Sequence, residues 1–443
     1  MMIKQLPVQG KLLYAASSAG WAMLDRIVIT WLMFYYTEGE NPLVLPAIFG
    51  SILVFGRIVD AIADPLVALW SDNSSSRLGR RTPFLMVGAL LYTAVFVALF
   101  YPPAAEHGTA NVIYLLVMAG AYFFMFTVYV CPYLALMPEL ARTAHDRVDM
   151  ATYRAVFSLL GVAAALVGSG LLIGSMGFRG MIWTTAIIGM LLMYLPVLVK
   201  EREYADAQPA TLGLVDAVLT TLKNRAFRFY LAGNAAFWFG FNIITLGLPF
   251  YVTVLLGRPE EDTAILFAAA FGVAFIAFPL VNILAKKIGH KAVMIISMAL
   301  FVLILPQFYF LGRPPFGLDP VVHAYLVMAL AGIPLSSLFV LPDAIVSSIT
   351  DLEAGLSGQR REAMYFGTQG LVLKIMMGLS TFVTGLMLQF FGRTAVEPLG
   401  VQLTGPVAAL FVLIGGIIFW FYPEREVKEG EQAAFPPDAF NVR

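Results

Sequence analysis

Charged residues and cysteine are both scarce in this chain of 443 residues. Asp, Glu, Lys and Arg make up 13% of it, about half of the roughly 25% that is typical of soluble proteins. The single cysteine, Cys131, lies in an apolar run, which excludes a disulfide framework and a cysteine-based metal site. Lys and Arg balance Asp and Glu at 28 each, so the net charge says nothing about acidic or basic partners; we expect no nucleic-acid partner. No resident cofactor is expected either, since no metal-ligand spacing relates the four histidines, His107, His145, His290 and His323.

Apolar residues dominate the composition instead. They make up 60% of the chain, 35 of them phenylalanine, and the mean hydropathy is +0.82. Because a membrane span requires about 20 mostly apolar residues, the apolar runs predict an all-α membrane protein with twelve transmembrane helices. The predicted spans are 12–36, 44–70, 83–101, 112–137, 151–174, 181–199, 229–256, 263–287, 292–311, 323–348, 366–391 and 402–422.

Basic residues cluster in every second loop. Lys and Arg gather at 77–81, 142–147, 200–228, 286–291 and 360–361, whereas the intervening loops hold single arginines. The positive-inside rule therefore places these loops and both termini on the cytoplasmic side of the cell (inner) membrane. The long polar loop predicts four parts: an N-terminal six-helix bundle (1–199), a cytoplasmic middle loop (200–228), a C-terminal six-helix bundle (229–422) and a cytoplasmic tail (423–443). The basic turns "SRLGRRTPF" and "AKKIGHKAV" occupy matching places in the two halves, which indicates pseudo-symmetric bundles with a substrate site between them.

The second predicted span carries three ionisable residues. Arg57, Asp60 and Asp64 are spaced i, i+3 and i+7, so they share one face of a helix. Each charge at bilayer depth costs roughly 2.5–3.5 kcal/mol, which excludes a lipid-facing position. Pro65 frees the carbonyl of Ala61 from the helix ladder, and hard oxygen donors of this kind suit a small cation or a proton. The structural alternative is an ion pair of Arg57 with one aspartate, which leaves the other aspartate unexplained.

A counter-charge lies in the eleventh predicted span. Lys374, in "GTQGLVLKIMMG", has no acidic neighbour in sequence, and a buried lysine either pairs or loses its proton. We expect Lys374 to pair with Asp60. The alternative is that its long stem reaches the cytoplasmic interface.

Three stretches resemble the signatures of the glycoside–pentoside–hexuronide:cation symporters, the melibiose carrier-like family of the major facilitator superfamily. They read "GRIVDAIADPLVALWSDNSSSRLGRRTPF", "CPYLALMPELARTAHDRVDMATYR" and "DLEAGLSGQRREAMYFGTQGLVLK". The opening "KLLYAASSAGWAMLDRIVITWLMFYYTE" also fits the first helix of that family. The resemblance thus runs through the whole chain, and it implies the major facilitator fold.

The resemblance implies roles for individual residues. Asp60 and Asp64 match the cation-site carboxylates, and Thr127 matches a hydroxyl ligand of the cation. Lys374 matches a lysine beside the cation site, and Arg154 matches an arginine that contacts the substrate.

The chain also departs from the melibiose carriers. Ala63 replaces an asparagine ligand of sodium, while Ala22 and Val130 replace two sugar-binding aspartates and Leu134 replaces a stacking tryptophan. We therefore expect the cation site without the melibiose-type sugar site. Since the site lacks one sodium ligand and two carboxylates a turn apart can share a proton, Na⁺ and H⁺ both remain candidate coupling ions, with Na⁺ held at Asp60 and Asp64.

The small-molecule substrate is expected to be a sugar or glycoside held by other residues. The alternative is a lysophospholipid-like or other amphipathic substrate, because a related vertebrate branch carries lysophospholipids. Asp25 in particular is costly within a span and therefore functional by default. Besides Arg154, the candidate substrate-binding residues are Trp21, Asp25, Tyr133, Asn234, Trp238 and Asn242.

The basic loops offer a cytoplasmic gate that breaks as the two halves rock. The simpler interpretation is that these charges only set the topology, and both interpretations are compatible. The candidate gate residues are Asp72, Arg77, Arg80, Arg81, Arg142, Arg147, Arg360 and Arg361.

The sequence therefore predicts a monomeric secondary active transporter that couples symport to Na⁺ or H⁺ by alternating access. A facilitator or exporter of a lipid and a non-transporting receptor are the alternatives within the same fold. An enzyme is not expected, because the chain has no catalytic serine motif, His or Cys cluster, or nucleotide-binding loop.

Overall fold

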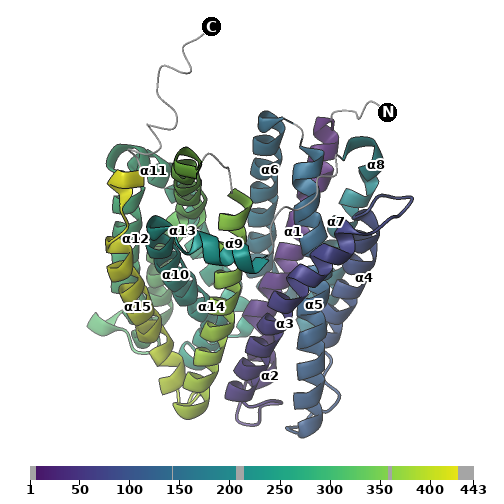
Figure 1. Ribbon diagram of the computed structural model, residues 1–443. Helices are drawn as coiled ribbons and strands as arrows, with labels where there is room; N and C mark the ends of the chain where they lie inside the picture. Colours follow the sequence, from purple (N-terminus) through teal and green to yellow (C-terminus); the bar gives the residue numbers. More distant parts are fainter. Residues whose placement is uncertain (1–5, 142, 206–213, 358–361, 428–443) are drawn as a thin grey trace. The chain divides into compact units, whose positions relative to one another are not determined.

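The structure is a computed structural model that describes residues 6–141, 143–205, 214–357 and 362–427. All the regular secondary structure among these residues is helical, and loops connect the helices (Figure 1). In the first half the main helices are α1 (Val8–Ile27), α2 (Met33–Thr37), α3 (Pro46–Asp72), α4 (Thr82–Leu99), α5 (Thr109–Leu140), α6 (Ala144–Ala163), α7 (Ser169–Tyr194) and the short α8 (Glu201–Tyr204). In the second half they are α9 (Leu214–Thr221), α10 (Arg225–Phe250), α11 (Thr263–Ile288), α12 (His290–Ile304), α13 (Pro320–Ser357), α14 (Glu362–Phe390) and α15 (Leu399–Trp420).

The helices lie on all twelve predicted spans. Within the described residues, nine helical stretches are long and apolar enough to cross a membrane. One of them, His145–Leu198, is 54 residues long and contains Gly177 at φ 70°, so it holds two spans that meet at this glycine. Helices α1 and α3 are not among the nine. Helix α1 carries Asp25, and α3 carries Arg57, Asp60 and Asp64, which together are called the stripe below.

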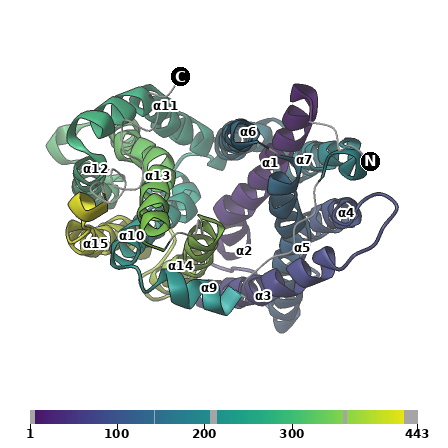
Figure 2. The ribbon, with the colours of Figure 1, turned by 45° about the horizontal axis from the view of Figure 1, so that its top comes forward.

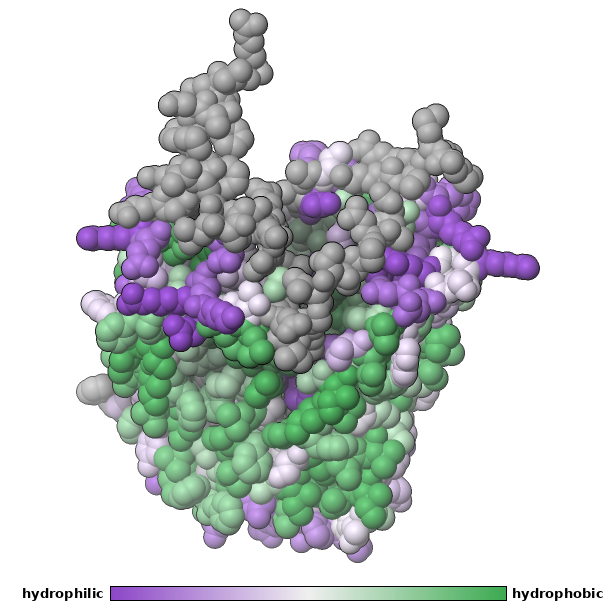
Figure 3. All heavy atoms as spheres, in the orientation of Figure 1, coloured by the Kyte–Doolittle hydropathy of each residue, from purple (hydrophilic) through white to green (hydrophobic). Residues whose placement is uncertain are grey.

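Hydrophobic side chains cover the flanks of the helices, and hydrophilic ones gather at the helix ends (Figure 3). The exposed apolar residues include Ile276 and Leu303, with 80% and 69% of their surface accessible. Such exposure is costly in water and favourable in lipid. The predicted fold class, an all-α membrane protein, is thereby confirmed.

The chain forms two compact units. The first comprises residues 1–211, 245–265 and 382–398, and the second comprises 212–244, 266–381 and 399–443. The first unit therefore includes two segments from the second half of the sequence. Within it, the guanidinium of Arg393 donates to the carbonyl of Thr37 at 2.8 Å, and the backbone N–H of Ala47 donates to Gln389 Oε1 at 2.9 Å.

Small residues allow close helix packing in the first unit. A Cβ on Gly161 of α6 would lie 2.3 Å from the carbonyl oxygen of Ala19 in α1, and a Cβ on Gly20 would lie 2.6 Å from that of Gly189 in α7. Glycine at these positions lets the backbones of α1, α6 and α7 approach closely, as is usual between membrane helices. These helices lie side by side in both ribbon views (Figures 1 and 2).

Candidate functional site

Helices α3 and α5 pack in a register that brings their polar residues together. A Cβ on Gly56 of α3 would lie 2.2 Å from the ring of Phe123 in α5, so this close approach requires glycine. One turn further along each helix, Asp60 meets Thr127. After another turn, the carbonyl of Asp64 meets Cys131. The same offset of 67 residues relates both of these pairs.

Asp60 is the most enclosed carboxylate of this stripe. Its exposed fraction is 0% and that of Thr127 is 1%. The hydroxyl of Thr127 donates to Asp60 Oδ1 at 2.5 Å, and Arg57 Nη1 lies 3.6 Å from Asp60 Oδ2. The guanidinium of Arg57 also lies 4.5 Å from the centroid of the Phe123 ring. Asp60 therefore has a hydroxyl on one carboxylate oxygen and a guanidinium near the other.

Asp64 lies at the more open end of the stripe. Its side chain is half-buried, and Thr127 Oγ1 lies 3.5 Å from Asp64 Oδ1. Thr127 therefore lies between the two carboxylates. The thiol of Cys131 is 3.8 Å from the backbone carbonyl of Asp64, and α3 continues as a helix through Pro65.

These groups suit a small monovalent cation or a proton. Two carboxylates, one hydroxyl and nearby backbone carbonyls supply hard oxygen ligands. In the described part of the chain, no group of three or more His, Cys, Asp or Glu side chains is placed to hold a metal ion. The structure thus brings together Arg57, Asp60, Asp64 and Thr127, as the sequence and the resemblance predicted, although cation binding itself stays a prediction.

Helix α1 adds a second charged group beside this stripe. Asp25 and Arg26 are both half-buried, and Arg26 interacts electrostatically with Asp25, Arg57 and Tyr122. Tyr122, on α5, shares a hydrogen bond with Tyr92 at 2.9 Å between the two hydroxyls. These tyrosines were not predicted, because nothing in an apolar run distinguishes a packing tyrosine from one beside a charge.

Trp21 lies one turn before Asp25. Its ring meets Phe126 edge to face, with 6.0 Å between centroids. Its indole N–H is buried and has no hydrogen-bond acceptor among the described residues. A buried donor of this kind is usually satisfied by water or a ligand, so Trp21 remains a candidate substrate contact.

Tyr133 and Arg154 lie nearer the start of α1. The rings of Tyr14 and Tyr133 stack at 4.5 Å, and each hydroxyl donates to the other residue's backbone carbonyl, at 2.7 and 3.1 Å. Tyr133 is fully buried and therefore packs α1 against α5. Arg154 is half-buried and interacts electrostatically with both tyrosines. Substrate binding by Tyr133 and Arg154 stays a prediction.

Helix α10, in the second unit, carries the polar candidate residues of that unit. Asn234, Trp238 and Asn242 are spaced by four residues and follow one face of this helix. Asn234 is fully buried, and neither atom of its amide has a hydrogen-bond partner in the described structure. Asn242 donates to Ser380 Oγ at 2.7 Å, while its carbonyl oxygen has no donor among the described residues. Trp238 lies edge to face with Phe339 at 5.9 Å.

Lys374 lies on α14 in the second unit and is half-buried. Its predicted pairing with Asp60, which belongs to the first unit, stays a prediction.

An ionic network joins the basic loop 76–81 to three acidic residues. Arg81 pairs with Asp72 and with Glu139, both at 2.7 Å, and Arg80 pairs with Glu139 at 2.8 Å. The carboxylate of Glu201 accepts hydrogen bonds from the backbone N–H groups of Arg80, Arg81 and Thr82 at 2.8–3.1 Å. It therefore caps the start of α4, where N–H groups lack helical partners and the helix dipole favours an anion.

This network lies wholly within the first unit. Gly79, at φ +123°, forms the turn, and a Cβ there would lie 2.2 Å from the Glu201 carboxylate. Glu139 and Glu201 are almost fully buried, and the sequence analysis missed both. The arginines of the loop could have pointed to them, because buried arginines need anionic partners, and Asp72 alone does not supply enough of them.

The remaining candidate gate residues form fewer ion pairs and hydrogen bonds. Arg77 is exposed and has no ion pair within the described chain, and Arg147 donates to the carbonyl of Ala141 at 3.3 Å. Nearby, Lys11 pairs with Asp146 at 2.6 Å and with Asp149 at 2.9 Å. Hydrogen bonds to these two carboxylates raise the pKa of Lys11 above its ordinary value. Arg142, Arg360 and Arg361 lie outside the described residues.

The helices and the buried charges together define a polytopic membrane transporter. Residues 13–423 match the family described as MFS/sugar transport protein. The chain belongs to this family of the major facilitator superfamily, so the predicted family is confirmed.

Relatives of different specificity share the full length of the chain. The isoprimeverose transporter of Lactiplantibacillus pentosus is 22% identical over 92% of this chain and 86% of its own. The sodium-dependent lysophosphatidylcholine symporter 1 of Xenopus tropicalis is 23% identical over 96% of this chain and 89% of its own. A solved structure of a bacterial homologue of the human lysosomal transporter Spinster shares the fold, with a TM-score of 0.70 at 15% identity over 96% of this chain and 99% of that one.

Proposed function

We propose that the protein is a cation-coupled symporter that carries a small polyhydroxylated solute, a sugar or glycoside, by alternating access. The observation that carries this proposal is the fully buried Asp60, hydrogen-bonded to Thr127 and followed one turn later by Asp64. Two carboxylates within a membrane span are retained at a cost of several kcal/mol only where they have a function. Na⁺ or H⁺ is the coupling ion.

The cation acts by neutralising the stripe. Without it, the stripe itself holds two carboxylates, those of Asp60 and Asp64, and one guanidinium, that of Arg57. A bound cation removes this imbalance and lets the polar stripe enter a closed, water-poor state. By linkage, cation and substrate then raise each other's affinity by the same factor.

The polar residues of α10 favour a hydroxylated substrate. An unsatisfied buried amide costs about 1–3 kcal/mol, and three amide atoms of Asn234 and Asn242 are in this condition within the described structure. Sugar hydroxyls both donate and accept hydrogen bonds, so they match these atoms. The lysophospholipid-like alternative is supported by the resemblance to the lysophosphatidylcholine symporter, but the acyl chain of such a substrate offers these amides no hydrogen-bond partner.

The proposal includes an orientation. Both termini and the basic loops lie in the cytoplasm of a cell whose inner membrane holds the protein, because Lys and Arg concentrate in those loops. The protein acts as a monomer, without a resident cofactor, and is not an enzyme.

Thermal unfolding in detergent tests the cation site without knowledge of the substrate. Melting temperatures are compared in Na⁺, Li⁺ and K⁺ at equal ionic strength and at several pH values. A cation at 100 times its Kd adds about 2.7 kcal/mol to the free energy of unfolding. We expect either stabilisation by Na⁺ or Li⁺ over K⁺, or stabilisation as the pH falls.

Variants assign this response to the site. Asp64→Asn should remain folded but lose both the cation response and concentrative uptake. The control is Glu106→Gln, an exposed carboxylate between α4 and α5, which should behave as the wild type. Normal concentrative uptake by Asp64→Asn would refute the proposed coupling site.

A further inference from the structure

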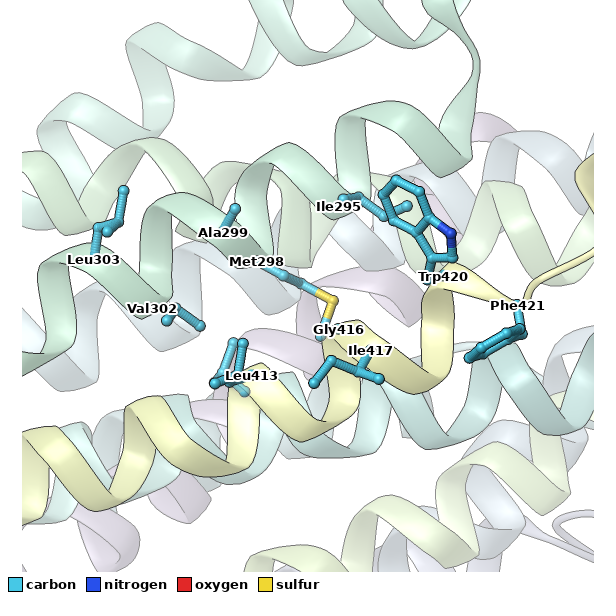
Figure 4. Close-up of a pocket in the computed structure, with 11 residues that line it drawn as sticks. Ile295, Met298, Ala299, Val302, Leu303, Leu413, Gly416, Ile417, Trp420 and Phe421 are labelled. Atoms are coloured by element: carbon cyan, nitrogen blue, oxygen red, sulfur yellow. The ribbon is translucent and has the colours of Figure 1, made fainter.

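A long apolar groove runs along the lipid-facing side of the second unit. It has a volume of about 430 Å³, and its walls come from α12 and α15 alone. In Figure 4, Trp420 and Phe421 lie at one end of the groove and Leu303 lies at the other. The lining residues are Ile295, Met298, Ala299, Val302, Leu303, Val412, Leu413, Gly416, Ile417, Trp420 and Phe421.

The floor of the groove is part of the core, and its rims face the membrane. Met298 and Val412 are almost fully buried, whereas Ile417 and Trp420 have 57% and 62% of their surface exposed. Gly416 also lines the groove, and a Cβ there would lie 3.8–4.0 Å from Met298, at ordinary contact distance. The groove is therefore narrow, apolar and open along its length to lipid.

An acyl chain fits this shape, but shape alone does not select a lipid. Lipid tails are as apolar as the leucines that would line their path, so a chain gains little by leaving the bilayer for a groove. Selection requires a polar contact at one end. The end at Trp420 and Phe421 supplies it.

Two cations flank that end of the groove. Lys291 lies in the first turn of α12, four residues before Ile295 of the lining, and its ammonium donates to the carbonyl of Tyr422 at 2.7 Å. This bond uses one of three N–H donors and holds the charge beside the last turn of α15. On the other side, the rings of Phe421 and Phe229 lie 6.1 Å apart between centroids. The guanidinium carbon of Arg225 lies 5.9 Å from the centroid of the Phe229 ring.

Basic groups outnumber acidic ones around this end. Glu426 lies 4.0 Å from Arg225, an exposed and therefore weak pair, and Glu424 accepts from the backbone N–H of Lys291 at 3.2 Å. Within the described residues 225–228, 286–291 and 422–427, these two acids stand against six basic residues, namely Arg225, Arg228, Lys286, Lys287, Lys291 and Arg425.

We propose that the groove binds an anionic phospholipid. One acyl chain lies between α12 and α15, and the phosphate contacts Lys291 and Arg225. Basic sites beside membrane helices bind anionic headgroups, and each juxtamembrane cation contributes about fivefold to the affinity. Two cations therefore give about a 30-fold preference for phosphatidylglycerol over phosphatidylcholine.

Native mass spectrometry of the purified full chain, in an equimolar mixture of these two lipids, tests the proposal. We expect the wild type to retain phosphatidylglycerol about 30-fold over phosphatidylcholine. The double variant Arg225→Gln and Lys291→Gln should retain both lipids equally, whereas Lys200→Gln, which removes an exposed cation near α8, should keep the preference. Equal retention by the wild type, or an unchanged preference in the double variant, would overturn the proposal.

A second pair of variants tests the groove itself. Gly416→Trp should fill it and reduce retained phosphatidylglycerol at least tenfold. Leu410→Trp places the same side chain on α15 at an exposed position outside the lining and should leave retention unchanged. Equal losses in both variants would show that the lipid binds elsewhere. Arg225 is exposed and Lys291 is half-buried, so we expect the charge variants to fold, and they decide the question even if Gly416→Trp does not.

Discussion

The contact between Gly56 and Phe123 makes the cation site sensitive to a single methyl group. In Gly56→Ala the new Cβ would lie 2.2 Å from the Phe123 ring. Ordinary contact begins at 3.4 Å, so the ring or the helix must move by about 1.2 Å. The ring has little room, because Arg57 lies over it at 4.5 Å and Tyr122 meets it edge to face at 5.3 Å. We therefore expect α3 and α5 to separate.

The cost follows from two opposing effects. Overpacking a core costs about 1–3 kcal/mol, and alanine gains about 1 kcal/mol over glycine in a helix, so the free energy of unfolding should fall by up to about 2 kcal/mol. The same displacement would stretch the Thr127–Asp60 hydrogen bond from 2.5 Å beyond bonding distance. A hydrogen bond to a charged group contributes about 1.5–3 kcal/mol. If the free energy of cation binding loses this contribution, the cation affinity should fall roughly 10- to 150-fold.

The assay is thermal unfolding of the purified variant, titrated with the coupling cation. Phe123→Leu combined with Gly56→Ala should recover part of the cation affinity, because the smaller side chain makes room for the methyl group. Gly272→Ala is the matched control, since no atom lies within 4 Å of a Cβ at that helical glycine. Wild-type cation affinity in Gly56→Ala would refute the argument that this close approach positions Asp60.

Three further predictions concern the helix cap at Glu201 and the candidate substrate-binding residues Arg154 and Asn234. Glu201→Gln should lower the free energy of unfolding by about 1–3 kcal/mol, because it removes a charged acceptor from the start of α4. In thermal unfolding the control Glu203→Gln should change little, because this half-buried carboxylate pairs with the exposed Lys200; equal effects would contradict the capping role. Arg154→Ala should weaken substrate binding while the cation response persists, which isothermal titration with a transported sugar would measure; unchanged substrate affinity would count against this residue. Asn234→Leu should stabilise the protein in the absence of substrate and weaken sugar binding at least tenfold, whereas unaltered sugar binding would remove α10 from the site.

The membrane fold and the charged stripe could be predicted from local sequence. Apolar runs of about 20 residues dictate helices in lipid, because every backbone polar group must be satisfied within the segment. The spacing of Arg57, Asp60 and Asp64 places them on one face without any knowledge of a partner helix. Thr127 entered only through the family resemblance, since a hydroxyl in an apolar run carries no signal of its own.

The ionic network shows why the remainder could not be predicted. The loop arginines were evident, yet their partners Glu139 and Glu201 lie about 60 and 120 positions away along the chain. Only the packing of α4, α5 and α8 brings them together. The predicted latch role concerned the two halves of the chain, whereas the ion pairs described here join segments of one unit.

The sequence alone determined what the bilayer imposes: helices on the predicted spans, a polar stripe that must avoid lipid, and basic loops. The tertiary structure decided which residues meet. The 67-residue register between α3 and α5 depends on a glycine fitting against one aromatic ring, and the groove depends on side chains that α12 and α15 bring together. Such contacts are set by the shapes of two surfaces at once, and no local pattern encodes them.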